Sequence, residues 1–313
     1  MRNILGFPKI WWPKLRNSER KISLASLRTI MGFVWTVTLV KLKVNGARVI
    51  HYENQKSALR LNKKTALGEK NEIIHIEPDD VIYRALSIFG EWGKAESEFL
   101  ATICEEKITF IDLGANVGLI TKQLLNLTNQ IDKVLVVEPR TETMANLRLN
   151  LMNTIQISQI EAIFCQFALD KISGISVLYT EVGNIGNSSL EKNLTPNSFR
   201  ETVRIMSSES FYTEFLNNEE SYILKSDLQG LDATVLNALP QQFWKRVKGA
   251  VIEVWPSESI DYQEVFELSK KLTNGFKCSF SPTLTKCLDS NMLTEYWSSP
   301  DNKSQNLYLR KNQ

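Results

Sequence analysis

The segment that most constrains the fold of this chain is Phe110–Gly118, with the sequence Phe-Ile-Asp-Leu-Gly-Ala-Asn-Val-Gly. A buried-type strand ends beside an acid, the chain turns at Gly114, and a helical period begins after Gly118. Glycine lets the backbone approach a ligand without a Cβ in the way, and the first turn of a helix presents unpaired N–H groups. Glu138 ends the next predicted strand, 20 residues after Gly118, where a carboxylate can accept both hydroxyls of a ribose. This order of elements predicts a nucleotide-binding crevice.

Short apolar runs alternate with helical periods from about residue 81 onward, which is typical of a parallel sheet covered by helices. The predicted strands are Ile108–Asp112, Lys133–Glu138, Ile160–Phe164, Tyr222–Asp227, Ala250–Val254, Gly275–Phe280 and Asn306–Leu309. The predicted helices run from Gly118 to about Thr128 and over Thr141–Leu151, Asp232–Leu239 and Tyr262–Leu272. Residues 177–206 interrupt the alternation with a strand-rich insertion that contains a loop at Gly183–Leu190. We expect a Rossmann-like, doubly wound, mostly parallel seven-stranded sheet of the α/β class, closed by a C-terminal antiparallel hairpin.

The positive charge is concentrated at the N-terminus. The first 60 residues carry twelve Lys and Arg against two acids, a net charge of +10, and the remaining residues carry −8. The most apolar stretch, Ile30–Val40, is shorter than the roughly 20 residues that cross a bilayer. Two interpretations stay open for residues 1–45: an anchor at the membrane surface, or an element packed on the rest of the chain. With strand-like runs at Ala47–Tyr52 and Ile73–Ile76, residues 1–78 form a basic N-terminal accessory region.

Composition narrows the chemistry that the chain can perform. The four cysteines form no C-x-x-C pair, so neither a disulfide framework nor a structural zinc site is predicted. This cysteine usage is typical of a reducing compartment, so we expect a cytoplasmic protein, with peripheral membrane association as the alternative. The two histidines, His51 and His75, exclude a His-rich metal centre. The acidic second part of the chain and the lack of an N/D-P-P-Y/F motif argue against a nucleic-acid partner. The chemistry therefore depends on carboxylates, lysines, backbone groups or a bound cofactor.

The spacing of the glycine turn differs from the dinucleotide fingerprint. It has the form D-x-G-x-x-x-G from Asp112 to Gly118, rather than G-x-G-x-x-G. A pyrophosphate would be repelled by Asp112, whereas a cofactor with a sulfonium and an ammonium group would be attracted. The pattern resembles motif I of the class I S-adenosylmethionine-dependent methyltransferases.

Residues 79–313 also resemble one family of these enzymes, the FkbM methyltransferases, in four further stretches. These are Gly90–Ser97, Val137–Arg140, Gly183–Leu190 and Lys225–Asp232. The last matches a K-x-D-x-E-G-x-E signature, with Gln229 and Asp232 where glutamate is usual, so one negative charge is missing near the expected substrate site. The resemblance implies a methyltransferase domain over 79–313 that uses S-adenosylmethionine to methylate a hydroxyl of a sugar, glycan or natural product.

The cofactor is expected to lie along the carboxyl ends of the first three strands. The glycine turn and Asp112 would border its methionine part, Glu138 its ribose, and the residues after the third strand its adenine. The predicted cofactor-binding residues are Asp112, Gly114, Ala115, Asn116, Gly118, Glu138, Gln166 and Ala168.

The predicted catalytic residues are Asp227, Lys225 and Glu253. Lys225 and Asp227 point to the same face because side chains alternate along a strand, and Glu253 ends the neighbouring strand. Asp227 is the expected base toward the acceptor hydroxyl. The alternative is a divalent cation such as Mg²⁺, held by Asp227 and Glu253, that acidifies the hydroxyl. Structural alternatives are an internal Lys225–Asp227 salt bridge and a backbone cap by Glu253.

The acceptor is expected to contact aromatic, amide and hydroxyl side chains. The candidates are Trp92, Asn184, Ser188, Ser189 and Trp255. Two other functions stay open: a non-catalytic binding module that keeps the methyltransferase fold, and a nicotinamide-dependent oxidoreductase. The second lacks both G-x-G and a Tyr-x-x-x-Lys motif.

Overall fold

The computed structural model describes residues 47–51, 57–77, 81–104, 107–190, 198–216, 221–256 and 261–312. All of them belong to one compact unit, Asn45–Gln313. Residues 1–45, for which we predict either membrane contact or packing on the rest of the chain, lie outside the described residues. Within the described ranges, no helix combines the length and the apolar character that crossing a bilayer requires.

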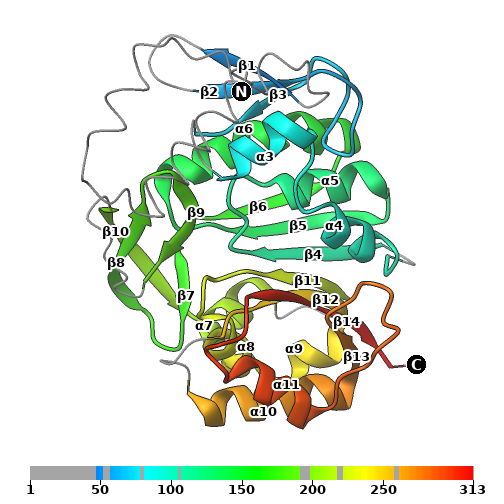
Figure 1. The fold of residues 1–313 in the computed structure, drawn as a ribbon, viewed down its shortest axis with the longest axis vertical. Helices are drawn as coiled ribbons and strands as arrows, with labels where there is room; N and C mark the ends of the chain where they lie inside the picture. Colours follow the sequence, from blue (N-terminus) through cyan, green and yellow to red (C-terminus); the bar gives the residue numbers. More distant parts are fainter. Residues whose placement is uncertain are drawn as a thin grey trace, which may run out of the picture. The chain divides into compact units, whose positions relative to one another are not determined.

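Seven strands form the large sheet (Figure 1). They are β4 (Ile108–Leu113), β5 (Ile131–Val137), β6 (Glu161–Cys165), β11 (Tyr222–Ser226), β12 (Val247–Val254), β13 (Phe276–Ser279) and β14 (Gln305–Lys311). The order is β13-β14-β12-β11-β4-β5-β6, and all pairs are parallel except the two that β14 makes. The predicted fold class is confirmed, including the closing antiparallel hairpin.

Helices cover both faces of this sheet, because its central strands are apolar on both sides. Ile111 and Leu113 of β4 face one layer of helices, and Ile108 and Phe110 face the other. The first layer contains α8 (Asp232–Ala238), α9 (Gln241–Arg246), α10 (Tyr262–Gly275) and α11 (Ser290–Trp297). The second contains α4 (Lys94–Ala101), α5 (Leu119–Leu127) and α6 (Thr141–Ser158). Every even-numbered side chain of β4 therefore points toward the α4–α5 layer.

The strand-rich insertion between β6 and β11 folds as a second, four-stranded sheet. Its strands, in the order β7-β10-β8-β9, are β7 (Ala168–Asp170), β8 (Gly174–Glu181), β9 (Asn184–Ser189) and β10 (Ser198–Ser207). The segment that we expected as a loop, Gly183–Leu190, contains strand β9, which pairs with β8. Two short helices, α7 (Ser208–Phe211) and the π-helical η1 (Tyr212–Leu216), lead back toward β11.

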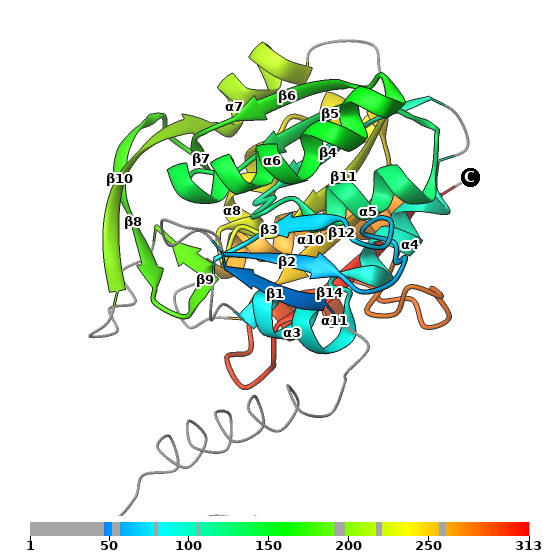
Figure 2. The ribbon, with the colours of Figure 1, turned by 90° about the horizontal axis from the view of Figure 1, so that it is seen from above.

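A third sheet, β1 (Ala47–His51), β2 (Ser57–Leu61) and β3 (Ile73–His75), precedes helix α3 (Val81–Phe89). Figures 1 and 2 show β3 beside α6 and the other two strands beside α3. Leu59 and Ile74 share a core with Val117 and Leu119, which belong to the start of α5 and the turn before it. The two strand-like runs of the sequence correspond to β1 and β3. The domain boundary at residue 78 stays a prediction.

Candidate functional site

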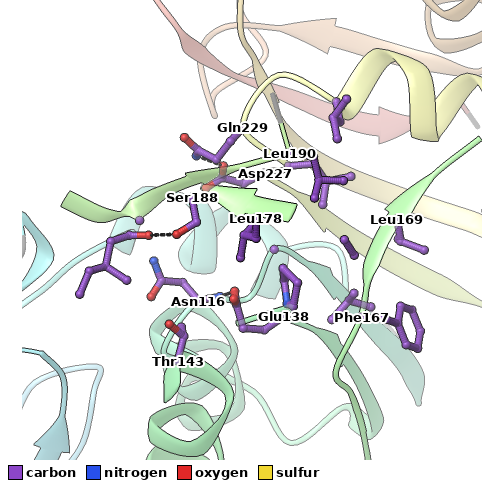
Figure 3. A pocket seen from close by; sticks show the side chains of 18 residues that line it. Asn116, Glu138, Thr143, Phe167, Leu169, Leu178, Ser188, Leu190, Asp227 and Gln229 are labelled. Carbon is purple, nitrogen blue, oxygen red and sulfur yellow. Dashed lines mark hydrogen bonds between the residues drawn. The ribbon is translucent and has the colours of Figure 1, made fainter. Parts of the chain in front are cut away.

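A pocket opens at the carboxyl ends of β4, β5 and β11, the edge at which open α/β sheets bind ligands (Figure 3). Its volume is about 640 Å³, a figure that includes the solvent-filled mouth. It is lined by Gly114, Asn116, Val137, Glu138, Pro139, Thr143, Phe167, Ala168, Leu169, Leu178, Ile185, Gly186, Ser188, Leu190, Asp227, Leu228, Gln229 and Leu231. None of these described lining residues is Lys or Arg.

The glycine turn after β4 is shaped by close packing. Gly114 has φ +73°, and a Cβ there would lie 1.9 Å from the carbonyl oxygen of Asp227. Gly118 has φ +79°, and a Cβ would lie 3.1 Å from Leu147 of α6. Both glycines are therefore required by neighbouring backbone and side chains, whatever binds in the pocket. Gly114 lines the pocket, whereas Ala115 and Gly118, also predicted to bind cofactor, lie behind the lining.

Glu138 is aimed by two backbone donors. The N–H groups of Asn116 and Arg140 donate to its two carboxylate oxygens at 3.1 and 3.0 Å. Burial raises the pKa of Glu138 to about 7, although these hydrogen bonds lower it. A carboxylate that ionises near neutral pH thus lines the pocket at the position predicted to hold a ribose.

Asp112 lies beneath the pocket and does not line it. As an even-numbered residue of β4 it faces α5, where its Oδ2 accepts a 2.6 Å hydrogen bond from the Thr121 hydroxyl. Its Oδ1 has no hydrogen-bond partner and lies 3.6 Å from the Lys225 Nζ. Burial raises the pKa of Asp112. Asp112 therefore does not line the pocket, and its link to the pocket residue Asp227 is the side chain of Lys225, which lies close to both carboxylates.

Lys225 links the strand ends under the pocket. Its Nζ donates to the carbonyl oxygen of Gly114 at 2.8 Å and lies 3.4 Å from Asp227 Oδ2. Burial lowers the pKa of Lys225, but the carboxylates of Asp227 and Asp112 outweigh that effect and the net pKa is raised. The lysine is therefore charged, and the internal salt bridge that we gave as the structural alternative is present.

Asp227 and Glu253 are neighbours, as the register of β11 and β12 predicts, and a hydrogen bond joins their side chains. The Gln229 Nε2 atom donates to Asp227 Oδ1 at 2.5 Å and lies 3.4 Å from Glu253 Oε2. Burial alone would raise the pKa of Asp227, but the charge of Lys225 lowers it, and the net pKa is below its ordinary value. Burial and the charge of Asp227 raise the pKa of Glu253 to about 10. At neutral pH Glu253 therefore carries the proton and Asp227 carries the charge.

This donor set does not fit a divalent cation. An ammonium group lies 3.4 Å from one oxygen of Asp227, and an amide nitrogen donates to the other. Hard cations require oxygen ligands around them, and Lys225 would repel one. Among the residues that the structure describes, no group of three or more His, Cys, Asp or Glu gathers where a metal could be held.

The wall beyond Glu138 is apolar. Phe167, Ala168 and Leu169 follow β6, and Leu178 comes from β8 of the insertion. Of the two residues predicted beside an adenine, Ala168 lines the pocket. Gln166 is exposed outside it and donates from Nε2 to the Thr141 hydroxyl at 3.0 Å.

Of the five predicted acceptor residues, Ser188 lines the pocket. Its hydroxyl donates to the carbonyl oxygen of Ile185 at 2.7 Å (Figure 3). Asn184 and Ser189, at the two ends of β9, lie outside the lining, as do both tryptophans. Trp92 packs against the core under β2 and β3, and its carbonyl accepts from Gln123. Trp255 is half-buried directly after β12.

Several lining residues of the insertion were not predicted from the sequence. Leu178, Ile185 and Leu190 reach the pocket only because the insertion folds over the strand ends.

Comparisons with known proteins give fold likeness only. No protein-family model and no curated protein sequence matches the chain. Methyltransferase FkbM from Methylobacillus flagellatus KT is similar over 65% of this chain, with 11% sequence identity and a TM-score of 0.41. An rRNA methylase from Streptococcus thermophilus is similar over 69% of this chain, with 13% identity and a TM-score of 0.37. Aeropyrum pernix fibrillarin with bound S-adenosyl-L-methionine is similar over 85% of this chain, with 11% identity and a TM-score of 0.36. The matches cover 43%, 94% and 99% of those chains, so the match spans less than half of the FkbM structure.

Proposed function

We propose that this chain is an S-adenosylmethionine-dependent methyltransferase. The observation that carries the proposal is the charge of the pocket: Glu138 and Asp227 both line it, and none of its described lining residues is Lys or Arg. A cofactor that brings a sulfonium, an ammonium group and ribose hydroxyls suits this lining. A diphosphate would meet two acids and no cation among the described lining residues, which disfavours a nicotinamide dinucleotide.

The topology of the large sheet supports the same reading. Numbered along the chain, its seven strands run 3-2-1-4-5-7-6, with strand 7 antiparallel between strands 5 and 6. The doubly wound dinucleotide-binding sheet has the order 3-2-1-4-5-6. The closing antiparallel hairpin of β13 and β14, which the strand pattern of the sequence predicts, distinguishes this sheet from that order.

Each part of the cofactor has a matching surface in the pocket. Glu138 would accept the ribose hydroxyls, the Gly114 turn and Asn116 would border the methionine part, and the wall from Phe167 to Leu169 would pack on the adenine. The bound cofactor supplies an electrophilic methyl group. The polar and apolar sides of the pocket are arranged so that one nucleoside can use both.

The acid cluster at the other side suits proton removal from a hydroxyl. Asp227 is ionised, while Glu253 holds a proton, so Asp227 is the group able to accept one. Lys225 and Gln229 fix the orientation of its carboxylate. In the proposed reaction the acceptor hydroxyl would lie against Asp227, opposite the sulfur. It would give its proton to Asp227 as the carbon–oxygen bond forms and the methyl–sulfur bond breaks. Holding this geometry supplies much of the acceleration.

The proposed acceptor is a hydroxyl of a sugar, glycan or natural product. Ser188 and Gln229 present neutral donors and acceptors on the same side of the pocket as Asp227 (Figure 3). Such groups pair with hydroxyls. Phosphate or carboxylate groups would lack a cationic partner among the described lining residues.

Calorimetric titration of the full chain with S-adenosylmethionine, and separately with NAD, tests this function. We expect the first ligand to bind at one site and the second not to bind. Binding of NAD alone would replace the proposal by an oxidoreductase. Binding of neither would leave a methyltransferase fold used as a module of another kind.

A further inference from the structure

The carboxylate of Glu138 is fixed from two loops at once. Asn116, which donates to one oxygen, lies in the turn after β4, and Arg140, which donates to the other, directly precedes α6. The direction in which Glu138 faces the pocket therefore depends on how these two loops are held. Both are held by the same short stretch of chain, His75–Glu77, at the end of the N-terminal three-stranded sheet.

Glu77 holds the loop before α6 through Arg140. The Arg140 side chain is 5% exposed, its Nη1 contacts Glu77 Oε1, and its Nη2 lies 3.5 Å from Oε2. Nη1 also donates to the hydroxyl of Thr143, a pocket residue, at 3.0 Å. The other acid on Arg140, Glu142, has a side chain that is 58% exposed. Since screening weakens the exposed pair, Glu77 is the stronger constraint on the guanidinium.

His75 holds the turn after β4 through Asn150 of α6. The amide oxygen of Asn150 accepts from the backbone N–H of His75 at 2.7 Å, and its Nδ2 donates to the carbonyl oxygen of His75 at 2.9 Å. The same Nδ2 donates to the carbonyl oxygen of Val117 at 2.8 Å. Val117 directly follows Asn116, whose N–H donates to Glu138. The buried amide of Asn150 therefore joins the N-terminal sheet to this donor.

We propose that His75–Glu77 is a positioning element of the cofactor site, which sets the affinity for S-adenosylmethionine by fixing both backbone donors of Glu138. The inference rests on the proposed function. Glu77 and Asn150 are positioning residues, because they lie outside the pocket lining and act through Arg140 and Val117. The N-terminal sheet is then part of the site, and not only a cover for α6.

The chain offers a matched control for Glu77. Glu72 belongs to the same N-terminal region and pairs at 2.5 Å with another buried cation, Lys122, whose side chain is 1% exposed. This pair contacts neither donor of Glu138. Lys122 also donates to the backbone carbonyl oxygen of Asn150 at 2.9 Å, but not to the side-chain amide that joins His75 to Val117. We expect Glu77→Gln to weaken S-adenosylmethionine binding about tenfold in calorimetry, as loss of a charge-assisted contact does, and Glu72→Gln to change it less than twofold. Thermal melting of both variants measures any general loss of stability.

A second pair tests the other loop. Asn150→Ala removes the link between His75 and Val117, whereas Asn126→Ala removes an amide that donates to the carbonyl oxygen of Ala66, elsewhere in the N-terminal region. We expect weaker cofactor binding for the first and unchanged binding for the second. The double variant Glu77→Gln with Arg140→Gln should bind as weakly as Arg140→Gln alone, because Glu77 acts through Arg140.

The outcomes separate the two proposals. If the unaltered chain binds S-adenosylmethionine, and Glu77→Gln and Asn150→Ala bind it as tightly, the positioning role is wrong and the proposed function stands. If the unaltered chain does not bind it, the proposed function fails and takes this inference with it. If one variant is unfolded at the assay temperature, the other pair decides, and equal affinities in that pair overturn the positioning role.

Discussion

The two acids that line the pocket are held in different ways. Backbone N–H groups from two loops fix Glu138, whereas the side chains of Lys225, Gln229 and Glu253 surround Asp227. Backbone donors are set by the fold and survive the substitution of their own side chains. Side-chain donors can be changed one at a time. The orientation of Glu138 is therefore set by the backbone of two loops, whereas that of Asp227 is set by side chains that single substitutions can remove.

The two acids also differ in the charge that surrounds them. Both are strongly desolvated, and burial raises the pKa of each. Lys225, 3.4 Å from Asp227, reverses that effect there, but its weaker influence on Glu138 leaves the pKa of Glu138 at about 7. Lys225, together with the hydrogen bonds from Glu253 and Gln229, therefore holds the pKa of Asp227 below its ordinary value, whereas burial keeps the pKa of Glu138 raised. The substitutions below separate the two sides.

The largest effect is expected at Asp227. Asp227→Asn keeps the shape and removes the base, so turnover should fall by about 10²–10⁴-fold. S-adenosylmethionine binding should weaken far less than turnover, because the pocket keeps Glu138 when it loses the charge of Asp227. Glu253→Gln is the control within the same pair. Glu253 already carries a proton, so its neutral amide should cost less than fivefold in rate. A radiolabelled methyl-transfer assay with calorimetry measures both, and an active Asp227→Asn would remove the base from the account.

Gly114→Ala should damage both sides together. Its Cβ would lie 1.9 Å from the carbonyl oxygen of Asp227, and φ +73° is strained for alanine. We expect a loss of about 2–4 kcal/mol in the free energy of unfolding, with weaker cofactor binding and slower turnover. Gly174→Ala is the matched control, since nothing lies within 4 Å of its added Cβ. Denaturant unfolding measures the two, and equal stabilities would refute the close approach of the two loops.

Glu138→Ala should weaken S-adenosylmethionine binding by at least about tenfold, or roughly 1.4 kcal/mol, without loss of the fold. The carboxylate would no longer accept the ribose hydroxyls. Glu142→Ala, which removes an exposed acid from the start of α6, should leave the affinity unchanged. Calorimetry and thermal melting give both quantities. An unchanged affinity for Glu138→Ala would place the ribose elsewhere.

Affinity should depend on pH through Glu138. Its pKa of about 7 exceeds the ordinary 4.5, so folding favours its protonated form, and the stability contributed by this group is lost as pH rises from about 4.5 toward 7. Ribose hydroxyls and a cationic ligand favour the ionised form, so binding should strengthen severalfold between pH 6 and pH 8. Glu138→Gln should flatten this part of the profile. The same pH slope in both proteins would assign it to another group.

The smallest effect is expected from metal removal. The donors around Asp227 do not fit a divalent cation, so excess EDTA should leave the methyl-transfer rate unchanged. A rate that EDTA abolishes and Mg²⁺ restores would return a metal to the Asp227–Glu253 pair.

The elements of the large sheet could be predicted because each depends on a local pattern. The runs that became β4 and β11 are apolar on both faces, and the period over α6 is helical from Thr141 onward. The short helix α9 was missed because six residues hold too little period to detect. Strand β9 was missed because its pairing with β8 follows from the tertiary structure, and its Gly, Asn and Ser residues are typical of a loop.

The sequence predicts only those parts of the site that lie at the ends of strands. Glu138, Asp227 and Glu253 end three strands that share one edge, so their proximity followed from topology. The position of Asp112 depended on which layer of helices its side chain faces, and the sequence alone does not say that Thr121 receives it. The proposed role of His75–Glu77 could not be predicted from the sequence, since it depends on contacts with residues more than sixty positions away.

A crystal structure of the chain with S-adenosylhomocysteine tests the central claim most directly. The account predicts both ribose hydroxyls on the Glu138 carboxylate, the adenine against Phe167 and Leu178, and the sulfur on the side of the pocket that faces Asp227. A nucleoside bound elsewhere on the chain, or one in this pocket with its ribose away from Glu138, would contradict it.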